Sequence, residues 1–171
     1  YNIQYIRGTS MKRFYSGKTY THATGHSCAF RQWRADSHCN LIHGYSLQFE
    51  FTFGCDHLDE RNWAVDFGGL KPLKEWLKHM FDHTYLVARD DPEMETVQML
   101  NDKGLIDMRV VDATGCERFA EMAFDEANEI VKVISNGRCW VQKVTVKEHD
   151  ANSATCELAD TQKIRFVNSE I

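Results

Sequence analysis

Residues 37–53 read SHCNLIHGYSLQFEFTF, and this stretch decides the fold expected for the chain. From Tyr45 to Phe53 every second residue is large and apolar or aromatic, and the residues between them are polar. A period of two is typical of a β-strand with one buried face. The same parity, extended back by two residues, places His43 on the buried face, with Cys39 in the loop before it.

A thiol, an imidazole and a phenol at the end of a core-facing strand allow two interpretations. Buried polar groups are costly unless they are hydrogen-bonded, which favours a site that uses Cys39, His43 and Tyr45. Alternatively, His43 is a buried histidine with a hydrogen-bond partner, and Cys39 is a structural free cysteine, because free cysteine often behaves as a small hydrophobe. The residues alone leave both interpretations open.

Composition argues against several classes of protein. With 171 residues, 43% of them hydrophobic, the chain suits one globular domain. The net charge of −5, without a basic block, argues against a nucleic-acid partner. No apolar run approaches the roughly 20 residues that span a bilayer, and we see no secretory signal, so we expect a cytoplasmic protein without a membrane partner. The six cysteines include no C-x-x-C pair, which indicates reduced thiols rather than a disulfide framework.

We expect an N-terminal tail at 1–14 and a single domain at 15–171. Within that domain, residues 87–112 are rich in charge and read as an insertion, mostly loop with one short helix. Residues 15–30 read as extended, with His26 and Cys28 on the face of the large side chains. After a Gly-Gly break, a helix is predicted from the spacing of Leu70, Leu73, Leu77 and Met80. Two strands followed by a helix predict an antiparallel hairpin with the helix packed on one face.

Carboxylates elsewhere in the chain are further candidates for a site. Asp82 and His83 are adjacent at the end of the predicted helix, where a carboxylate can orient an imidazole, although a structural pair explains them equally well. Thr114 and Glu117 have capping-box spacing, which gives Glu117 a structural explanation. Glu148 continues the apolar face of the last strong strand. It is either solvated beyond the strand end, or a buried carboxylate that accepts paired N–H groups of a ligand.

The order of these features resembles the 6-pyruvoyl-tetrahydropterin synthase family, which includes the 6-carboxytetrahydropterin synthases (QueD-like) of queuosine biosynthesis. The resemblance covers residues 15–157, and its motifs are short, so their shared order and spacing carry it. After the extended stretch, the matching motifs are the Cys39 loop with His43-Gly44-x-Ser46, Asp66-Phe67-x-x-Leu70-Lys71, Asp82-His83, Thr114-x-x-Glu117 and Val144-x-Val146-x-Glu148.

The resemblance implies an α+β tunnelling fold (T-fold), with the order β-β-α-α-β-β. In that fold an antiparallel β-sheet has two helices on one face, and subunits close into an oligomeric β-barrel. The family is usually a homohexamer made from two trimers, with its sites at subunit interfaces. We therefore expect a homo-oligomer, a trimer or a hexamer, whose partner is a small-molecule pterin.

The resemblance also implies roles for particular residues. It makes Cys39, Asp82 and His83 catalytic, and it makes Glu148 and Glu117 pterin-binding. The implied activity is that of a lyase on dihydroneopterin triphosphate, in which Cys39 removes a proton from the side-chain carbon and the Asp-His pair relays another. Among the activities of the family, we expect that of a 6-carboxytetrahydropterin synthase. The alternatives are a 6-pyruvoyl-tetrahydropterin synthase and a non-catalytic pterin-binding homologue.

Zinc is the cofactor that the resemblance implies, and here the sequence departs from the family. The family pattern has three histidines, one on the first strand before an arginine and two in His-Gly-His. In this chain Phe30 precedes Arg31, and Tyr45 replaces the second histidine of the pair, so only His43 matches. The zinc site is either lost or rebuilt from nearby donors, with His26 and His43 as ligands and Tyr45 as the third.

Overall fold

The computed structural model describes residues 12–159 of the chain. Most of the expected tail and the last part of the expected domain, 1–11 and 160–171, lie outside the described residues. The helices are α1 (Lys71–Phe81), α2 (Met94–Asp102) and α3 (Cys116–Ile134), with short 3-10 turns η1 (His22–Thr24), η2 (His38–Asn40) and η3 (Phe67–Leu70). The strands are β1 (Phe14–Tyr20), β2 (His26–Phe30), β3 (His43–Cys55), β4 (Thr84–Ala88), β5 (Met108–Val111), β6 (Cys139–His149) and β7 (Asn152–Glu157).

The sheet is organised around β3, as the sequence predicts. Its order is β5-β4-β2-β3-β6-β7, and β1 also pairs with β3. Tyr20 at the end of β1 pairs with Phe49, and His26 at the start of β2 pairs with Leu47, so β1 and β2 run along the same side of β3 and η1 separates them. The extended conformation expected for residues 15–30 is therefore confirmed except at this turn.

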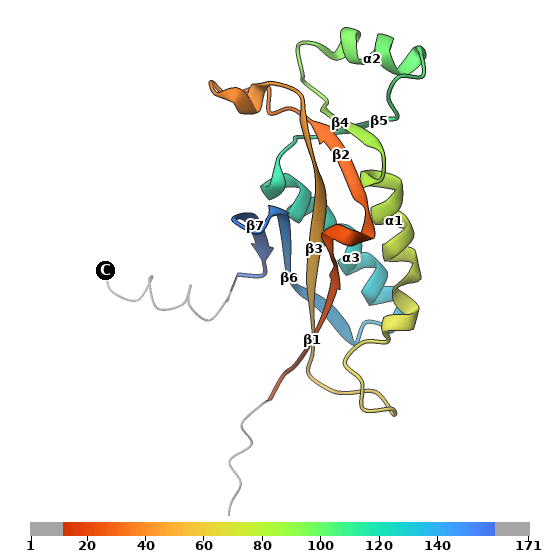
Figure 1. Ribbon diagram of the computed structural model, residues 1–171. Helices are drawn as coiled ribbons and strands as arrows, with labels where there is room; N and C mark the ends of the chain where they lie inside the picture. Colours follow the sequence, from red (N-terminus) through yellow and green to blue (C-terminus); the bar gives the residue numbers. More distant parts are fainter. Residues whose placement is uncertain (1–11, 160–171) are drawn as a thin grey trace, which may run out of the picture.

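The helices α1 and α3 cover one face of the sheet, as Figure 1 shows. Each buries an apolar stripe on the phenylalanines of β3, of which Phe49, Phe51 and Phe53 are at most 1% exposed. The buried positions include Leu73, Leu77 and Phe81 of α1 and Phe119, Ala120, Ala123, Ala127 and Val131 of α3. The alanines let α3 approach the sheet closely. The expected α+β fold with two helices on one face is confirmed.

The sheet is mixed, whereas the sequence predicted a purely antiparallel one. β4 lies parallel to β2, and β5 lies parallel to β4. Residues 87–112, expected to be mostly loop, contain β5 as well as α2. Strand β5 has four residues, most of which are partly exposed. Its sequence therefore shows little hydrophobic periodicity.

An ion pair joins residues 87–112 to the end of β2. The Arg31 guanidinium donates to both carboxylate oxygens of Asp91, Nε to Oδ2 at 2.9 Å and Nη2 to Oδ1 at 2.7 Å. The Asp91 side chain is only 1% exposed. The Arg31 guanidinium holds the pKa of the Asp91 carboxyl below its usual range. This contact fixes the segment after β4 beside the loop that carries Cys39.

Gly44 is required by the close approach of β2 and β3. A Cβ at this position would lie 2.5 Å from the backbone oxygen of Cys28, closer than real Cβ atoms come to backbone. Glycine therefore lets the strands pair directly beside His43 and Tyr45.

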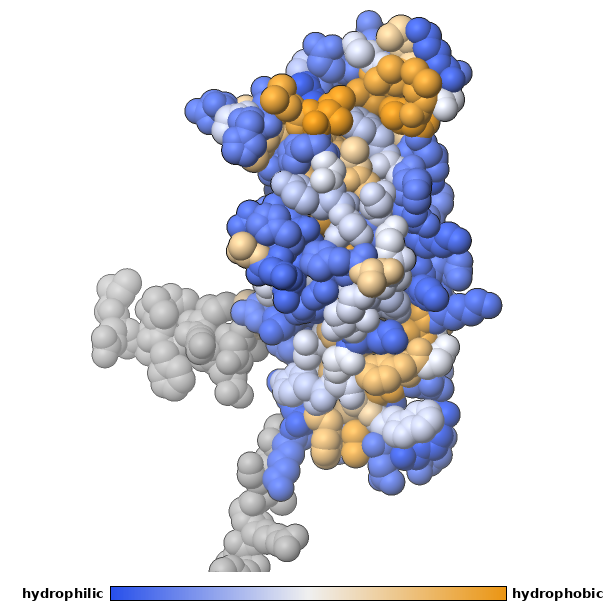
Figure 2. All heavy atoms as spheres, viewed as in Figure 1, coloured by the Kyte–Doolittle hydropathy of each residue, from blue (hydrophilic) through white to orange (hydrophobic). Residues whose placement is uncertain are grey.

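One face of the molecule is mainly polar. Figure 2 shows hydrophilic atoms over most of the viewed face, with apolar atoms gathered toward its two ends. Among the helices within residues 12–159, we find none with the length and apolar character needed to cross a membrane.

Candidate functional site

Several of the predicted residues gather around Tyr45 at the start of β3. The imidazole of His43 lies edge-on to the Tyr45 ring, with 5.7 Å between ring centroids. Glu148, Cys39 and Cys116 are all close enough to act on the pKa of the Tyr45 phenol. We call these five residues, Cys39, His43, Tyr45, Cys116 and Glu148, the Tyr45 site.

Local hydrogen bonds position Cys39 and His43. The backbone oxygen of Cys39 accepts from the Gln32 N–H at 2.9 Å, which ties η2 to the end of β2. The His43 Nδ1 lies 2.7 Å from the backbone oxygen of Leu41. A carbonyl oxygen only accepts, so Nδ1 carries the hydrogen and Nε2 keeps a free lone pair.

The carboxylate of Glu148 lies near the first turn of α3. Cys116, the first residue of α3, lies close enough to Glu148 for the carboxylate to act on its thiol. Burial, and after it the negative charge of Glu148, raise the pKa of the Cys116 thiol. Cys116 is therefore a neutral thiol at pH 7. Sequence reasoning missed it as a site residue, and its position directly before Glu117 was the one available signal.

The capping box predicted for α3 is wrong. The Thr114 hydroxyl donates to the backbone oxygen of Arg31 at 2.6 Å, and the residue at the cap position is Gly115, which has no side chain to offer. Thr114 instead ties the start of α3 to β2. Glu117 is exposed on the first turn of α3, so the cap no longer explains it.

Tyr45 is a hydrogen-bond donor at neutral pH. Burial is the main cause that raises the pKa of its phenol, and the negative charge of Glu148 adds to it. Because the shift is upward from an ordinary value near 10, the hydroxyl stays protonated at pH 7. The Tyr45 site thus presents one carboxylate, one neutral phenol and one imidazole lone pair.

Asp82 and His83 form a pair that lies apart from Cys39. The His83 Nδ1 is 2.6 Å from Asp82 Oδ1, and the His83 side chain is 89% exposed. His83 has a φ of 57°, and its N–H donates to the backbone oxygen of Ser27 at 2.7 Å. Cys39 is tied to Gln32, five residues further along the chain from Ser27. His83 lines a cavity beside Cys28 and Gly44, and Cys39 is not part of its lining.

The residues present do not fit a three-ligand zinc site. Phe30, at the position of the first family histidine, is fully buried and offers no donor atom. His26 pairs with Leu47, four residues along β3 from His43, which corresponds to about 13 Å. Zinc–nitrogen bonds are about 2.0–2.1 Å, so His26 and His43 cannot share an ion within this chain. Within the described residues no three or more His, Cys, Asp or Glu side chains are grouped to hold a metal.

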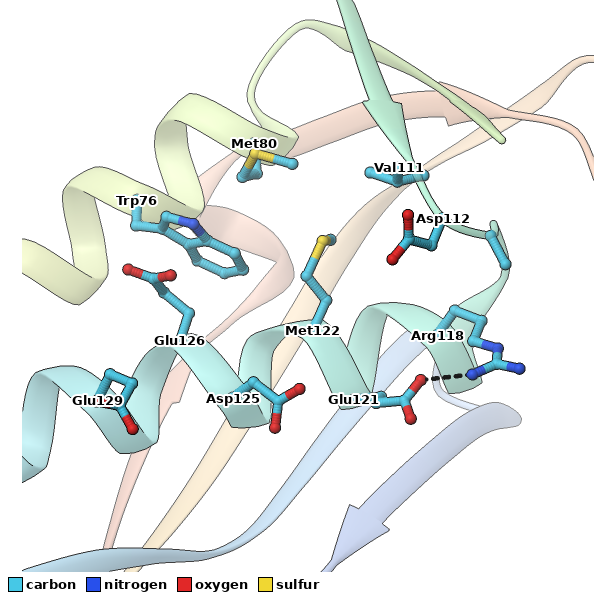
Figure 3. A pocket seen from close by; sticks show the side chains of 11 residues that line it. Trp76, Met80, Val111, Asp112, Arg118, Glu121, Met122, Asp125, Glu126 and Glu129 are labelled. Atoms are coloured by element: carbon cyan, nitrogen blue, oxygen red, sulfur yellow. Dashed lines mark hydrogen bonds and ion pairs between the residues drawn. The ribbon is translucent and has the colours of Figure 1, made fainter. Parts of the chain in front are cut away.

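A separate groove lies between α1 and α3, shown in Figure 3. Its volume is about 690 Å³, and its floor includes Trp76, Met80 and Met122. Carboxylates line its rim, and one of them, Glu121, pairs with Arg118 at 2.7 Å. None of the residues predicted for the site lines this groove.

Known structures share the fold described above. A crystal structure of an uncharacterized protein from Wolinella succinogenes matches with a TM-score of 0.70 and 15% identity, covering 86% of this chain and 98% of that one. The 6-pyruvoyl tetrahydropterin synthase of Plasmodium falciparum matches with a TM-score of 0.59 and 12% identity, covering 85% of this chain and 99% of that one. At these identities the likeness shows the fold alone, and that fold is the tunnelling fold.

The chain belongs to the 6-pyruvoyl tetrahydropterin synthase family, whose sequence profile matches residues 19–159. Curated relatives include two proteins named 6-carboxy-5,6,7,8-tetrahydropterin synthase. The one from Rickettsia conorii is 33% identical over 57 residues, which is 33% of this chain and 41% of that protein. The one from Aquifex aeolicus is 29% identical over 68 residues, 40% of this chain and 42% of that protein. The matched segments thus span less than half of these relatives. The family comprises lyase-type enzymes that act on pterins.

Proposed function

We propose that this chain is a lyase of the 6-carboxytetrahydropterin synthase type, acting on dihydroneopterin triphosphate in the synthesis of queuosine or a related deazapurine. The observation that carries this proposal is the meeting of Glu148 and Cys39 around Tyr45. A carboxylate accepts two parallel N–H groups, which is what the aminopyrimidine edge of a pterin presents. The names of the curated relatives favour the 6-carboxy product over the 6-pyruvoyl product.

In this proposal each residue of the site has one task. Glu148 accepts the N–H groups of the pterin ring, and Glu117 adds a second acceptor at the rim. The neutral Tyr45 hydroxyl donates to an oxygen of the ligand side chain. Cys39, half-buried in its loop, removes a proton from the side-chain carbon as a thiolate.

Asp82 and His83 enter the proposed site from a second copy of the chain. His83 is tied to Ser27 near the start of β2, whereas Cys39 is tied to Gln32 beyond its end, so the pair and Cys39 would meet on one ligand only when they come from different copies. The carboxylate holds His83 in one orientation, and the imidazole then exchanges a proton with the leaving oxygen. This arrangement requires the homo-oligomer that the family resemblance implies.

A second candidate function is favoured by Phe30. The buried phenyl ring stands where the family pattern has a metal-binding histidine, so the chain would keep the pterin pocket without turnover. In that case Glu148 still binds the ligand, while Cys39 serves no chemical step. The two candidates therefore agree on binding and differ on turnover.

The experiment that tests the proposal compares turnover with binding. We expect purified protein to consume dihydroneopterin triphosphate, with the product followed by mass spectrometry. Cys39→Ala should lower the rate by at least about 10²-fold, the usual effect of a lost acid–base group, and leave neopterin affinity within about twofold. Cys156→Ala, which changes a thiol on β7, is the matched control and should keep full activity. Binding without turnover in the unaltered protein would establish the second candidate.

A further inference from the structure

We propose that this chain binds its pterin without a metal, because an aromatic cluster of Phe30, His43, Tyr45 and Phe119 occupies the place of a zinc centre. The inference rests on the proposed function for the identity of the ligand. Hydrogen bonds from His43 and Tyr45, rather than coordination to a cation, hold the side chain of the ligand.

The register of β2 and β3 makes positions 30, 43 and 45 converge. Phe30 pairs directly with His43, and Tyr45 follows two residues later on the same face. The Phe30 ring lies 4.8 Å from the His43 ring and 6.2 Å from the Tyr45 ring, between centroids. Three side chains on one face of paired strands, at these separations, are arranged as ligands around a single point would be.

The phenyl ring of Phe30 occupies that point. It is 0% exposed and packs edge-to-face on Phe119 of α3, with 5.0 Å between centroids. A cation at this point would be surrounded by the phenyl face of Phe30, the protonated phenol of Tyr45 and one imidazole nitrogen of His43. Such a set leaves His43 as the single good zinc ligand, and one imidazole alone binds zinc weakly.

The polar atoms that remain are suited to a neutral oxygen. The Tyr45 hydroxyl is a donor, because the pKa of its phenol is raised, and His43 Nε2 is an acceptor, because Nδ1 donates to Leu41. A hydroxyl group on the ligand can accept from the first and donate to the second. The ligand class is therefore a pterin with a hydroxylated side chain, bound without a divalent cation.

Zinc binding by full-length protein tests this inference independently of turnover. We expect purified wild-type protein to contain much less than one zinc per chain by metal analysis. The double variant Phe30→His with Tyr45→His restores three imidazoles, and we expect it to bind one zinc at least about 100-fold more tightly, since even outer partners of zinc ligands change affinity 10–100-fold. Phe30→Leu with Tyr45→Phe is the matched control, which alters the same positions without adding donors.

Both parts of the inference can fail. Tight binding of one zinc per chain by the wild type would overturn it. A folded double variant, checked by circular dichroism, that binds zinc no better than the control would show that the three positions do not converge. If the double variant does not fold, the neopterin affinity of the wild type is measured with and without a metal chelator. A change in affinity greater than about twofold would also overturn the inference. Loss of turnover alone would contradict the proposed function and leave this result intact.

A second observation concerns two thiols at the opposite end of β3. Cys55, the last residue of β3, pairs directly with Cys139, the first residue of β6. Both thiols are buried, at 0% and 4% exposure, and lie close enough for Cys139 to raise the pKa of the Cys55 thiol, while the Cys139 thiol donates to the backbone oxygen of Ala64 at 2.6 Å. Directly opposed residues of antiparallel strands have Cα atoms about 4.5–5.5 Å apart, within the range that a disulfide spans.

We infer that Cys55 and Cys139 form a cross-strand disulfide when the chain meets a small-molecule disulfide such as oxidised glutathione. The thiolate of one cysteine attacks the reagent and releases one thiol, and the second thiolate then attacks the mixed disulfide and releases the other. Two electrons pass to the reagent, and the two protein protons end on the two released thiols. Burial raises the pKa of the Cys55 thiol, so the reaction is slow in the folded chain and proceeds best during folding.

Refolding in a glutathione redox buffer, followed by peptide mapping, tests the cross-link. We expect one peptide pair joined through Cys55 and Cys139, a mass lower by two hydrogens, and a melting temperature raised by on the order of 10 °C. Cys55→Ser should abolish the link, and Cys156→Ser should leave it unchanged. Refolded native protein that keeps both thiols free, or links either one elsewhere, would overturn the inference.

Discussion

Burial keeps two groups of the Tyr45 site, and one thiol beside it, protonated. Burial is the main cause that raises the pKa of Cys116 and of Tyr45, and it raises that of Cys28, which pairs with Tyr45 across the strands, to about 12. These three groups are therefore uncharged at pH 7. Glu148 is the carboxylate of the site, and it supplies the negative charge that the N–H groups of a ligand would meet.

Thiol exposure predicts which cysteine reacts first. Cys39 and Cys156 are partly exposed, whereas Cys28, Cys55, Cys116 and Cys139 are buried. Under limiting iodoacetamide we expect Cys39 and Cys156 to be labelled before the rest. Neopterin should protect Cys39 and leave Cys156 unprotected, which peptide mapping measures. Equal labelling of Cys39 with and without neopterin would place it outside the ligand site.

His26 predicts a pH dependence of stability. Its pKa is lowered, chiefly by burial and against the charge of Asp82. As the pH falls through about 6.5, His26 gains a proton in the unfolded chain but stays neutral in the folded chain. The stability of the folded chain is therefore complete above that pH and declines below it. His26→Phe should remove this decline, with little loss at pH 7.5 because the buried Nδ1 has no partner among the described residues.

Urea midpoints at pH 7.5 and 5.5 measure the effect of His26. The wild type should lose stability between these pH values, and His26→Phe should lose less. The same decline in both proteins would show that another group carries the acid sensitivity.

Strand parity correctly placed His26 on the buried face, but parity does not report distance along a strand, so it also suggested a shared zinc site with His43.

Elements in this fold are joined by side-chain contacts that periodicity cannot reveal. Asp91→Asn breaks the ion pair with Arg31 and should cost about 3 kcal/mol, because one partner of a largely buried pair stays behind without its countercharge. Asp90→Asn is the matched control. Its pair with Arg34 is exposed, at 48% and 64%, and should contribute less than about 1 kcal/mol. Equal losses in chemical denaturation would contradict the assignment of Asp91 as a buried anchor.

The strongly periodic elements were predictable from sequence for a physical reason. β3 and α1 each bury one face of a regular element, so the positions of Phe49 and Leu77 are visible in the spacing alone. β5 escaped prediction because it is short and partly exposed. The cap of α3 was predicted wrongly because the Thr114 hydroxyl donates to the backbone oxygen of Arg31, 83 residues away in sequence, and Gly115 is at the cap position. Long-range partners of this kind leave no local pattern.

Within residues 12–159, the sheet ends in two outer strands, and several aromatic side chains are exposed. β7 ends the sheet on one side and β5 on the other. Phe14, Trp63 and Phe67 are each more than 40% exposed near the start of β1 and the turn after β3. Closure with further copies removes edges and covers such surfaces. We therefore expect a trimer or hexamer, and light scattering at micromolar concentration measures it. A monomer would contradict this and would leave Asp82 and His83 without a site.

Anchoring of a pterin by Glu148 is the central claim, and a calorimetric titration of the full chain with neopterin tests it most directly. Glu148→Gln removes the charge and one of the two acceptor positions, so we predict a loss of about 1.5–3 kcal/mol, roughly 10–150-fold in affinity. Glu121→Gln, which alters an exposed carboxylate of α3 away from the site, should bind as the wild type does. Neopterin binding by Glu148→Gln with wild-type affinity would contradict the account.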